Sequence, residues 1–92
     1  MIVRIAGEGQ FEISDDCAGR LNDLDNRAVA AVEAGDRATF EDLFSQMIQL
    51  IESESSRLAD DELVVSDVIV PPRDITFDEA KAEFTGEGLI PD

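Results

Sequence analysis

Apolar and polar residues alternate at the start of the chain. In residues 1–6 one set of alternate positions is wholly apolar and the other carries Arg4, a pattern typical of a strand. The alternation returns in residues 10–13, where Phe11 and Ile13 follow polar neighbours. The turn residues Gly-Glu-Gly at positions 7–9 connect the two runs, which predicts a β-hairpin. An isolated hairpin is only marginally stable in water, so we expect it to pack on other elements.

An amphipathic helix is predicted next. Ser14, Asp15 and Asp16 favour a helix N-terminus, because their oxygens accept hydrogen bonds from unpaired amides and their charge suits the helix dipole. Apolar residues then recur at helical spacing on one face: Cys17, Leu21, Leu24, Ala28, Ala31 and Val32. Gly35 suits the left-handed residue that ends a helix, so we expect this helix to stop there.

A second helix is expected directly after the first, with Asp36 as its N-cap. Its apolar stripe is clearer, and Leu50 widens it. The stripe has the i, i+3, i+4, i+7 pattern of a buried helix face: Phe40, Leu43, Phe44, Met47, Ile48 and Ile51. So short a connection predicts an antiparallel helix pair, with residues 40–51 at the centre of the core.

The last third of the chain mixes extended and helical signals. Residues 52–57 contain three serines and are expected to fray from the second helix. Residues 63–65 and 68–70 are short apolar runs, which form either one bent strand or two extended pieces. Thr76 and Glu79 have the spacing of a capping box, which predicts a short helix to about Phe84, ended by the glycines of residues 86–88.

These elements predict one domain over residues 1–92 of the α+β class. It comprises an N-terminal β-hairpin packed on an antiparallel helix pair, an extended edge segment and a short C-terminal helix. No apolar run is long enough to span a membrane, and the start of the chain does not resemble a signal peptide, so we expect a cytoplasmic protein.

The charge of the chain restricts its partners. Twenty-two acidic residues against seven basic ones give a net charge of −15. Such a surface repels nucleic acid phosphates and anionic lipid headgroups, which argues against both as direct partners. It suits a basic protein surface, and it equally suits a salt-rich cytoplasm, because screening relieves the self-repulsion. The sequence leaves these two explanations open.

Catalytic groups are scarce. The chain has no histidine and one cysteine, Cys17, which lies on the apolar stripe and is expected to be buried. The turn at residues 7–9 lacks the spacing and the lysine of a phosphate-binding loop. Four acids, Asp60, Asp61, Glu62 and Asp67, lack the spacing of a calcium loop and are expected to be solvated. We therefore predict no enzyme activity, no cofactor and no metal.

One segment is a candidate for partner binding. It combines three β-branched apolar residues with a diproline that excludes the interior of a central strand: Ser66, Asp67, Val68, Ile69, Val70, Pro71 and Pro72. Either this segment covers the hairpin or the helix pair, or it is an exposed edge to which a partner adds a strand. A separate possibility is self-association through apolar surface left over at Val29, Leu50 or Phe84.

The whole chain resembles the PspA-associated domain family. The matching segments are "MIVRIAGEGQF" at residues 1–11, "RLNDLDNRAVAAVEAGDRATF" at 20–40, "DDELVVSDVIVPP" at 60–72 and "EGLIPD" at 87–92. The resemblance implies an accessory role in the envelope-stress response built around phage-shock protein A, a coiled-coil protein that assembles on membranes. It implies a non-enzymatic adaptor or regulator that binds a phage-shock protein A homologue and reaches the membrane only through that partner. The alternative is a self-associating structural domain, a homo-oligomer.

Overall fold

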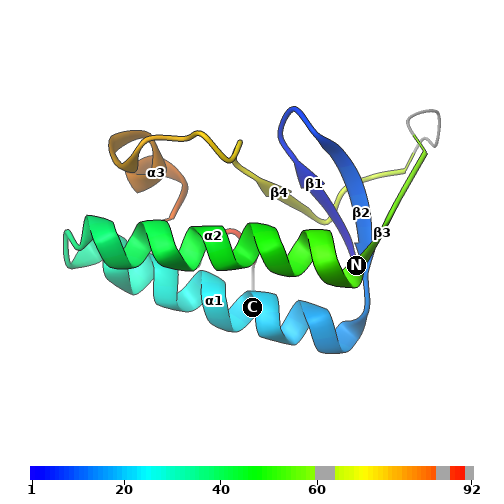
Figure 1. The fold of residues 1–92 in the computed structure, drawn as a ribbon, viewed down its shortest axis with the longest axis horizontal. Coiled ribbons are helices and arrows are strands. Elements are labelled where there is room, and N and C mark those ends of the chain that lie inside the picture. The colour runs from blue at the N-terminus through cyan, green and yellow to red at the C-terminus, as the bar shows by residue number, and fades with distance from the viewer. Residues whose placement is uncertain (60–63, 85–87, 91–92) are drawn as a thin grey trace.

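The structure, a computed structural model, describes residues 1–59, 64–84 and 88–90. It has the predicted α+β architecture. The hairpin strands are β1 (Ile2–Ile5) and β2 (Gly9–Ile13), followed by helices α1 (Asp15–Glu33) and α2 (Arg37–Glu54). Two short strands, β3 (Ser55–Arg57) and β4 (Val68–Val70), and a short helix α3 (Phe77–Glu83) complete the described elements. Figure 1 shows α1 and α2 side by side, with α3 near the end at which a short turn connects them.

The four strands form one mixed sheet in the order β3-β2-β1-β4. β1 pairs antiparallel with β2, placing Val3 opposite Phe11. β4 pairs parallel with β1, placing Val3 opposite Val68. The apolar residues at alternate positions, Val3, Ile5, Phe11, Ile13, Val68 and Val70, are buried, as the sequence pattern predicts, because one face of the sheet joins the hydrophobic core with the helix pair. The two predicted apolar runs do not form one strand: residues 68–70 form β4, whereas Val64 and Val65 belong to no strand and Leu63 lies outside the described residues.

The helix ends follow the predicted chemistry. Ser14 caps α1, Asp36 caps α2, and Thr76 with Glu79 forms a complete capping box at α3. Gly35 has a φ of 70° and ends α1 in the left-handed conformation. All seven apolar residues predicted for the second stripe are buried, including Leu50. The prediction that these side chains form the centre of the core is confirmed.

Two details differ from the sequence prediction. Residues 52–57 do not fray: α2 continues to Glu54, and Ser55–Arg57 form the edge strand β3, paired with β2. Pairing with a distant strand outweighs the weak strand preference of serine. The prediction of leftover apolar surface at Val29, Leu50 and Phe84 is also wrong, because these side chains are only 7%, 8% and 0% exposed. The residues beside Gly88 that were expected to end α3 lie outside the described residues.

Candidate partner-binding site

The segment singled out in the sequence lies at one edge of the sheet and presents two different faces. Val68 and Val70 point into the core and are 3% and 0% exposed, whereas Ile69 points away from it and is 62% exposed. Pro71 is buried, Pro72 and Asp67 are exposed, and Ser66 is half-buried. The segment therefore covers the hairpin's edge and still exposes a large apolar side chain.

The outer edge of β4 carries backbone groups directed away from the sheet. The amide of Ala6 donates to the carbonyl of Val70 at 2.9 Å, so the Val70 carbonyl points towards β1. Successive backbone groups of a strand alternate in direction, which turns the N–H and C=O of Ile69 to the opposite side. Among the described strands, β4 ends the sheet on that side. An edge of this kind is a template for pairing with another chain.

A hollow of about 570 Å³ adjoins this edge. Its apolar lining comes from the end of β1, from β4 and from the segment that follows β4: Ala6, Ile69, Pro71, Pro72 and Ile75. Three acids, Asp74, Glu79 and Glu83, complete the lining. The hollow therefore offers an apolar floor beside negative charge, a combination that suits an apolar side chain flanked by a basic one.

The chain that leads into β4 is fixed by a glutamine that the sequence reading did not select. Gln10 is 8% exposed, and its Nε2 donates to the carbonyl of Val64 at 2.9 Å and to Oγ of Ser66 at 2.8 Å. Asp67 adds a second tie, because its Oδ2 accepts from the Ile2 amide at 2.8 Å. These bonds help to hold β4 in position. In the sequence, the only sign that Gln10 lies on the outer face of the sheet was the alternation of residues 10–13.

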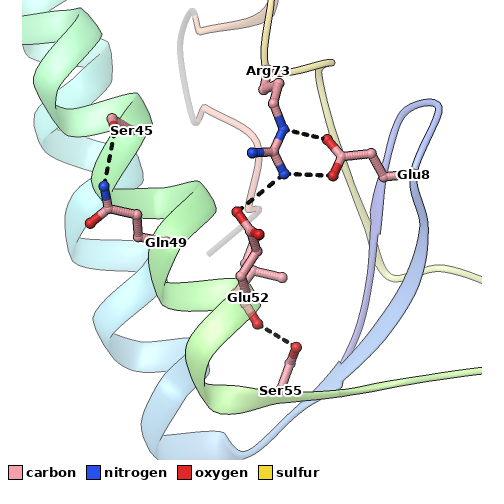
Figure 2. A network of polar contacts seen from close by, with 7 residues as sticks. Glu8, Ser45, Gln49, Glu52, Ser55 and Arg73 are labelled. Atoms are coloured by element: carbon pink, nitrogen blue, oxygen red, sulfur yellow. Dashed lines mark hydrogen bonds and ion pairs between the residues drawn. The ribbon is translucent and has the colours of Figure 1, made fainter.

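The chain that leaves β4 is tied down by one arginine (Figure 2). Arg73 makes a two-pronged contact with the Glu8 carboxylate at 2.8 and 2.6 Å, and its Nη2 also donates to Glu52 Oε1 at 3.1 Å. The contact joins the hairpin turn, the segment after β4 and α2. The hydrogen bond from Arg73 lowers the pKa of the Glu8 carboxyl and raises that of Arg73 itself.

We expect this network to contribute to stability only where Glu8 is ionised. Because the pKa of Glu8 is lower in the folded protein, the contribution is present above the ordinary carboxyl pKa of about 4.3 and is lost as the pH falls through the lowered value. A Glu8→Gln variant should thus be slightly less stable than the wild type at about pH 6, and this difference in stability should shrink as the pH falls through the lowered pKa of Glu8. Urea unfolding at several pH values measures this difference; a difference that does not change with pH would contradict it.

The other predicted candidates for chemistry have structural positions. Cys17 is 1% exposed, and burial raises the pKa of its thiol, which disfavours a reactive thiolate. Asp67 holds the Ile2 amide, whereas Asp60, Asp61 and Glu62 lie outside the described residues. Within residues 1–59, 64–84 and 88–90, the acidic residues and Cys17 do not form a group of three or more that could hold a metal ion. None of the helices in the described part of the chain is long and apolar enough to cross a membrane.

A buried aspartate is the clearest feature that sequence reasoning missed. Asp25 lies in the middle of α1 and is 0% exposed. Its carboxyl oxygens accept from the amide of Leu89 at 3.0 and 2.9 Å and from the amide of Ile90 at 2.9 Å. Gly88, with a φ of 78°, passes so close that a Cβ there would lie 2.6 Å from Asp25 Oδ2. The position of Asp25 on the apolar side of α1, between Leu21 and Ala28, was the available signal.

Among the comparisons with known proteins, the one with protein-family models finds a match. No curated protein and no solved structure matches it. A family model described as "PspA-Associated protein" matches residues 1–92, the full length of the chain. The resemblance noted from the sequence segments is confirmed, and the chain belongs to the PspA-associated protein family.

Proposed function

We propose that this protein is a non-enzymatic adaptor or regulator that binds a phage-shock protein A homologue through the edge of β4, in the envelope-stress response. The proposed surface is the segment 66–72 together with the hollow beside it. The observation that carries the proposal is the exposed Ile69 on an open sheet edge, in a chain that matches the PspA-associated family throughout. The protein would reach a membrane only through that partner.

The geometry favours strand addition as the mode of binding. An extended partner segment pairs with the outward backbone groups of Ile69, and its alternate side chains enter the hollow next to Pro71 and Ile75. The acids Glu79 and Glu83 on the wall of the hollow favour a lysine or arginine in that segment. Because the whole chain carries a charge of −15, the encounter with a basic partner is accelerated at low salt.

Co-purification tests the proposal. The tagged chain is co-expressed with the phage-shock protein A homologue from the same organism and isolated at physiological and at high salt. We expect a complex at physiological salt that is weaker at high salt, because screening reduces the attraction between opposite charges. The proposal fails if no complex forms under either condition.

A single substitution tests the surface. Ile69→Lys should weaken binding at least about tenfold, because it removes the apolar contact and places a positive charge against a basic partner. The side chain is 62% exposed, so the free energy of unfolding should change by no more than about 0.5 kcal/mol. Glu12→Lys is the control: it changes an exposed residue of β2, away from β4. Equal loss of binding in both variants would point to general charge effects and against this surface.

Self-association is a second candidate function. It would use the edge of β4, and not the surface at Val29, Leu50 and Phe84 that the sequence predicted. The open edge of β4 suits pairing with β4 of another copy, and Val64 and Val65 nearby are 41% and 88% exposed. The charge of −15 on each copy opposes such a dimer at low salt. Light scattering at low and high salt tests self-association, because a chain that is monomeric at both salt concentrations excludes it.

A further inference from the structure

A groove of about 770 Å³ lies between the first half of α1 and the second half of α2. Its lining comes from residues 15–24 and 46–54. It includes Leu24 and Leu50 from the apolar stripes of the two helices, and its other members are polar residues and Gly19. About ten residues of a helix span about 15 Å, so the groove is some three helical turns long. It shares no lining residue with the hollow beside β4.

A glycine in the wall of the groove is not required by its local geometry. Gly19 lies inside α1, is exposed, and a Cβ added to it would meet nothing within 4 Å. Glycine inside a helix lowers helix stability relative to alanine, and here neither a tight turn nor a close neighbour requires it. The missing side chain leaves space in which the backbone of another helix can approach closely. Leu24, which is half-buried, provides apolar contact in the same groove, whereas Leu50, only 8% exposed, contributes little more than the floor.

The charge around the groove selects the occupant. Four acids line it, Asp15, Asp16, Asp23 and Glu54, against one base, Arg20. Arg20 pairs with Glu54 at 2.7 Å and Arg27 contacts Asp23 at a longer 3.8 Å. The groove still keeps a net negative charge, which Asp15 and Asp16 at the start of α1 mainly carry. A second copy of this chain would bring a net charge of −15 towards these acids, so a basic partner fits better.

We propose that this groove binds a basic amphipathic helix of the partner, which packs as a third helix across Gly19. Small apolar residues of that helix contact Gly19 and Leu24, and its lysines or arginines face the aspartates of α1. The identity of the partner rests on the proposed function; the groove itself does not. The protein then has two docking surfaces, one for an extended segment at β4 and one for a helix between α1 and α2.

The test uses the full chain labelled for NMR and two probes. One is the phage-shock protein A homologue. The other is a synthetic amphipathic peptide of lysine, alanine and leucine, about five helical turns long, with a scrambled peptide of equal composition as its control. We expect the homologue and the amphipathic peptide to shift the amide signals of Gly19, Leu24 and Gln49, and the scrambled peptide to leave them unchanged. Equal shifts with the scrambled peptide would overturn the proposal.

Two matched pairs of variants sharpen the test. Gly19→Gln fills the groove with a long side chain and should weaken binding about tenfold or more, whereas Gly19→Ala, also a better helix former than glycine, should change it little. Asp23→Lys should weaken binding similarly, whereas Glu33→Lys makes the same charge change at the other end of α1 and should have a small effect.

Failure of this inference differs from failure of the proposed function. If the homologue binds the wild type, Gly19→Gln and Asp23→Lys equally well, the groove is not its docking surface, although the adaptor function stands. If the homologue does not bind at all, the adaptor function fails and the peptide alone decides on the groove. Peptide binding that Gly19→Gln weakens supports the groove, and absence of peptide binding overturns it.

Discussion

Replacing Asp25 with alanine is expected to lower the free energy of unfolding by about 2–4 kcal/mol. The substitution removes the acceptor for the amides of Leu89 and Ile90, the second of which is buried. We expect the cost to stay below that of two buried unpaired donors, because the Leu89 amide is only partly buried. Loss of these bonds should also weaken the packing of Ile90, which is 5% exposed. Urea unfolding followed by circular dichroism measures the change.

Two controls separate this contact from a general effect of mutating α1. Asp23→Ala changes an exposed aspartate two residues away and should cost no more than about 0.5 kcal/mol. Gly88→Ala should disrupt the same contact for two reasons. The added Cβ would lie 2.6 Å from Asp25 Oδ2, and alanine is strained at a φ of 78°. The double variant should therefore cost less than the sum of the two single ones. Full additivity, or an Asp25→Ala as stable as Asp23→Ala, would contradict the contact.

Replacing Phe40 with alanine is expected to cost about 3–5 kcal/mol. Phe40 is 1% exposed and lies at the centre of an aromatic cluster. Its ring centroid is 5.7, 5.8 and 5.1 Å from those of Phe44, Phe77 and Phe84. The cluster joins α2 to α3 and to the residue after it, so its loss should loosen α3 as well. A domain of this size has a total stability of about 5–15 kcal/mol, and the variant should be close to unfolding at 37 °C.

Phe40→Leu is the matched control, because it keeps an apolar side chain in the cavity and should cost less than about 1.5 kcal/mol. Thermal unfolding of both variants gives the comparison. Hydrogen exchange at the amides of α3 shows whether the helix loosens. If Phe40→Ala unfolds at the same temperature as Phe40→Leu, then Phe40 is not the centre of the core.

The parts of the fold that sequence predicts well are those decided by neighbours along the chain. The stripe from Phe40 to Ile51 has one helical period, and Ser14, Asp36 and Thr76 cap helices through amides only three residues away. The hairpin follows from alternation interrupted by glycines. In each case the residues that make the contact lie close in sequence, so a short window contains the whole pattern.

The parts that sequence did not predict depend on contacts between distant residues. Ser55–Arg57 become a strand because β2 is available as a partner, although the serines themselves favour a turn. Gln10 is buried because residues 64 and 66 pass within hydrogen-bonding distance. Asp25 is tolerated inside α1 because amides 64 and 65 residues later satisfy its oxygens. A single sequence contains no pattern that pairs these positions.

The sequence identified residues 66–72 as an edge segment, but it did not reveal the contacts that hold this segment in place. The β-branched residues and the diproline located an edge segment, and Ile69 is its exposed residue. The parallel pairing with β1, the anchoring by Arg73 and the hollow beside α3 all come from residues elsewhere in the chain. The sequence did not reveal the groove between α1 and α2. The open space beside Gly19 is created by residues of both helices and is visible only in the structure.

Calorimetric titration of the purified chain with the purified phage-shock protein A homologue tests the account most directly. We expect saturable binding at a salt concentration of about 0.15 M, weaker binding at about 1 M, and at least a tenfold loss of affinity with Ile69→Lys but not with Glu12→Lys. An absence of binding heat and of a complex at both salt concentrations, or an affinity that Ile69→Lys leaves unchanged, would contradict it.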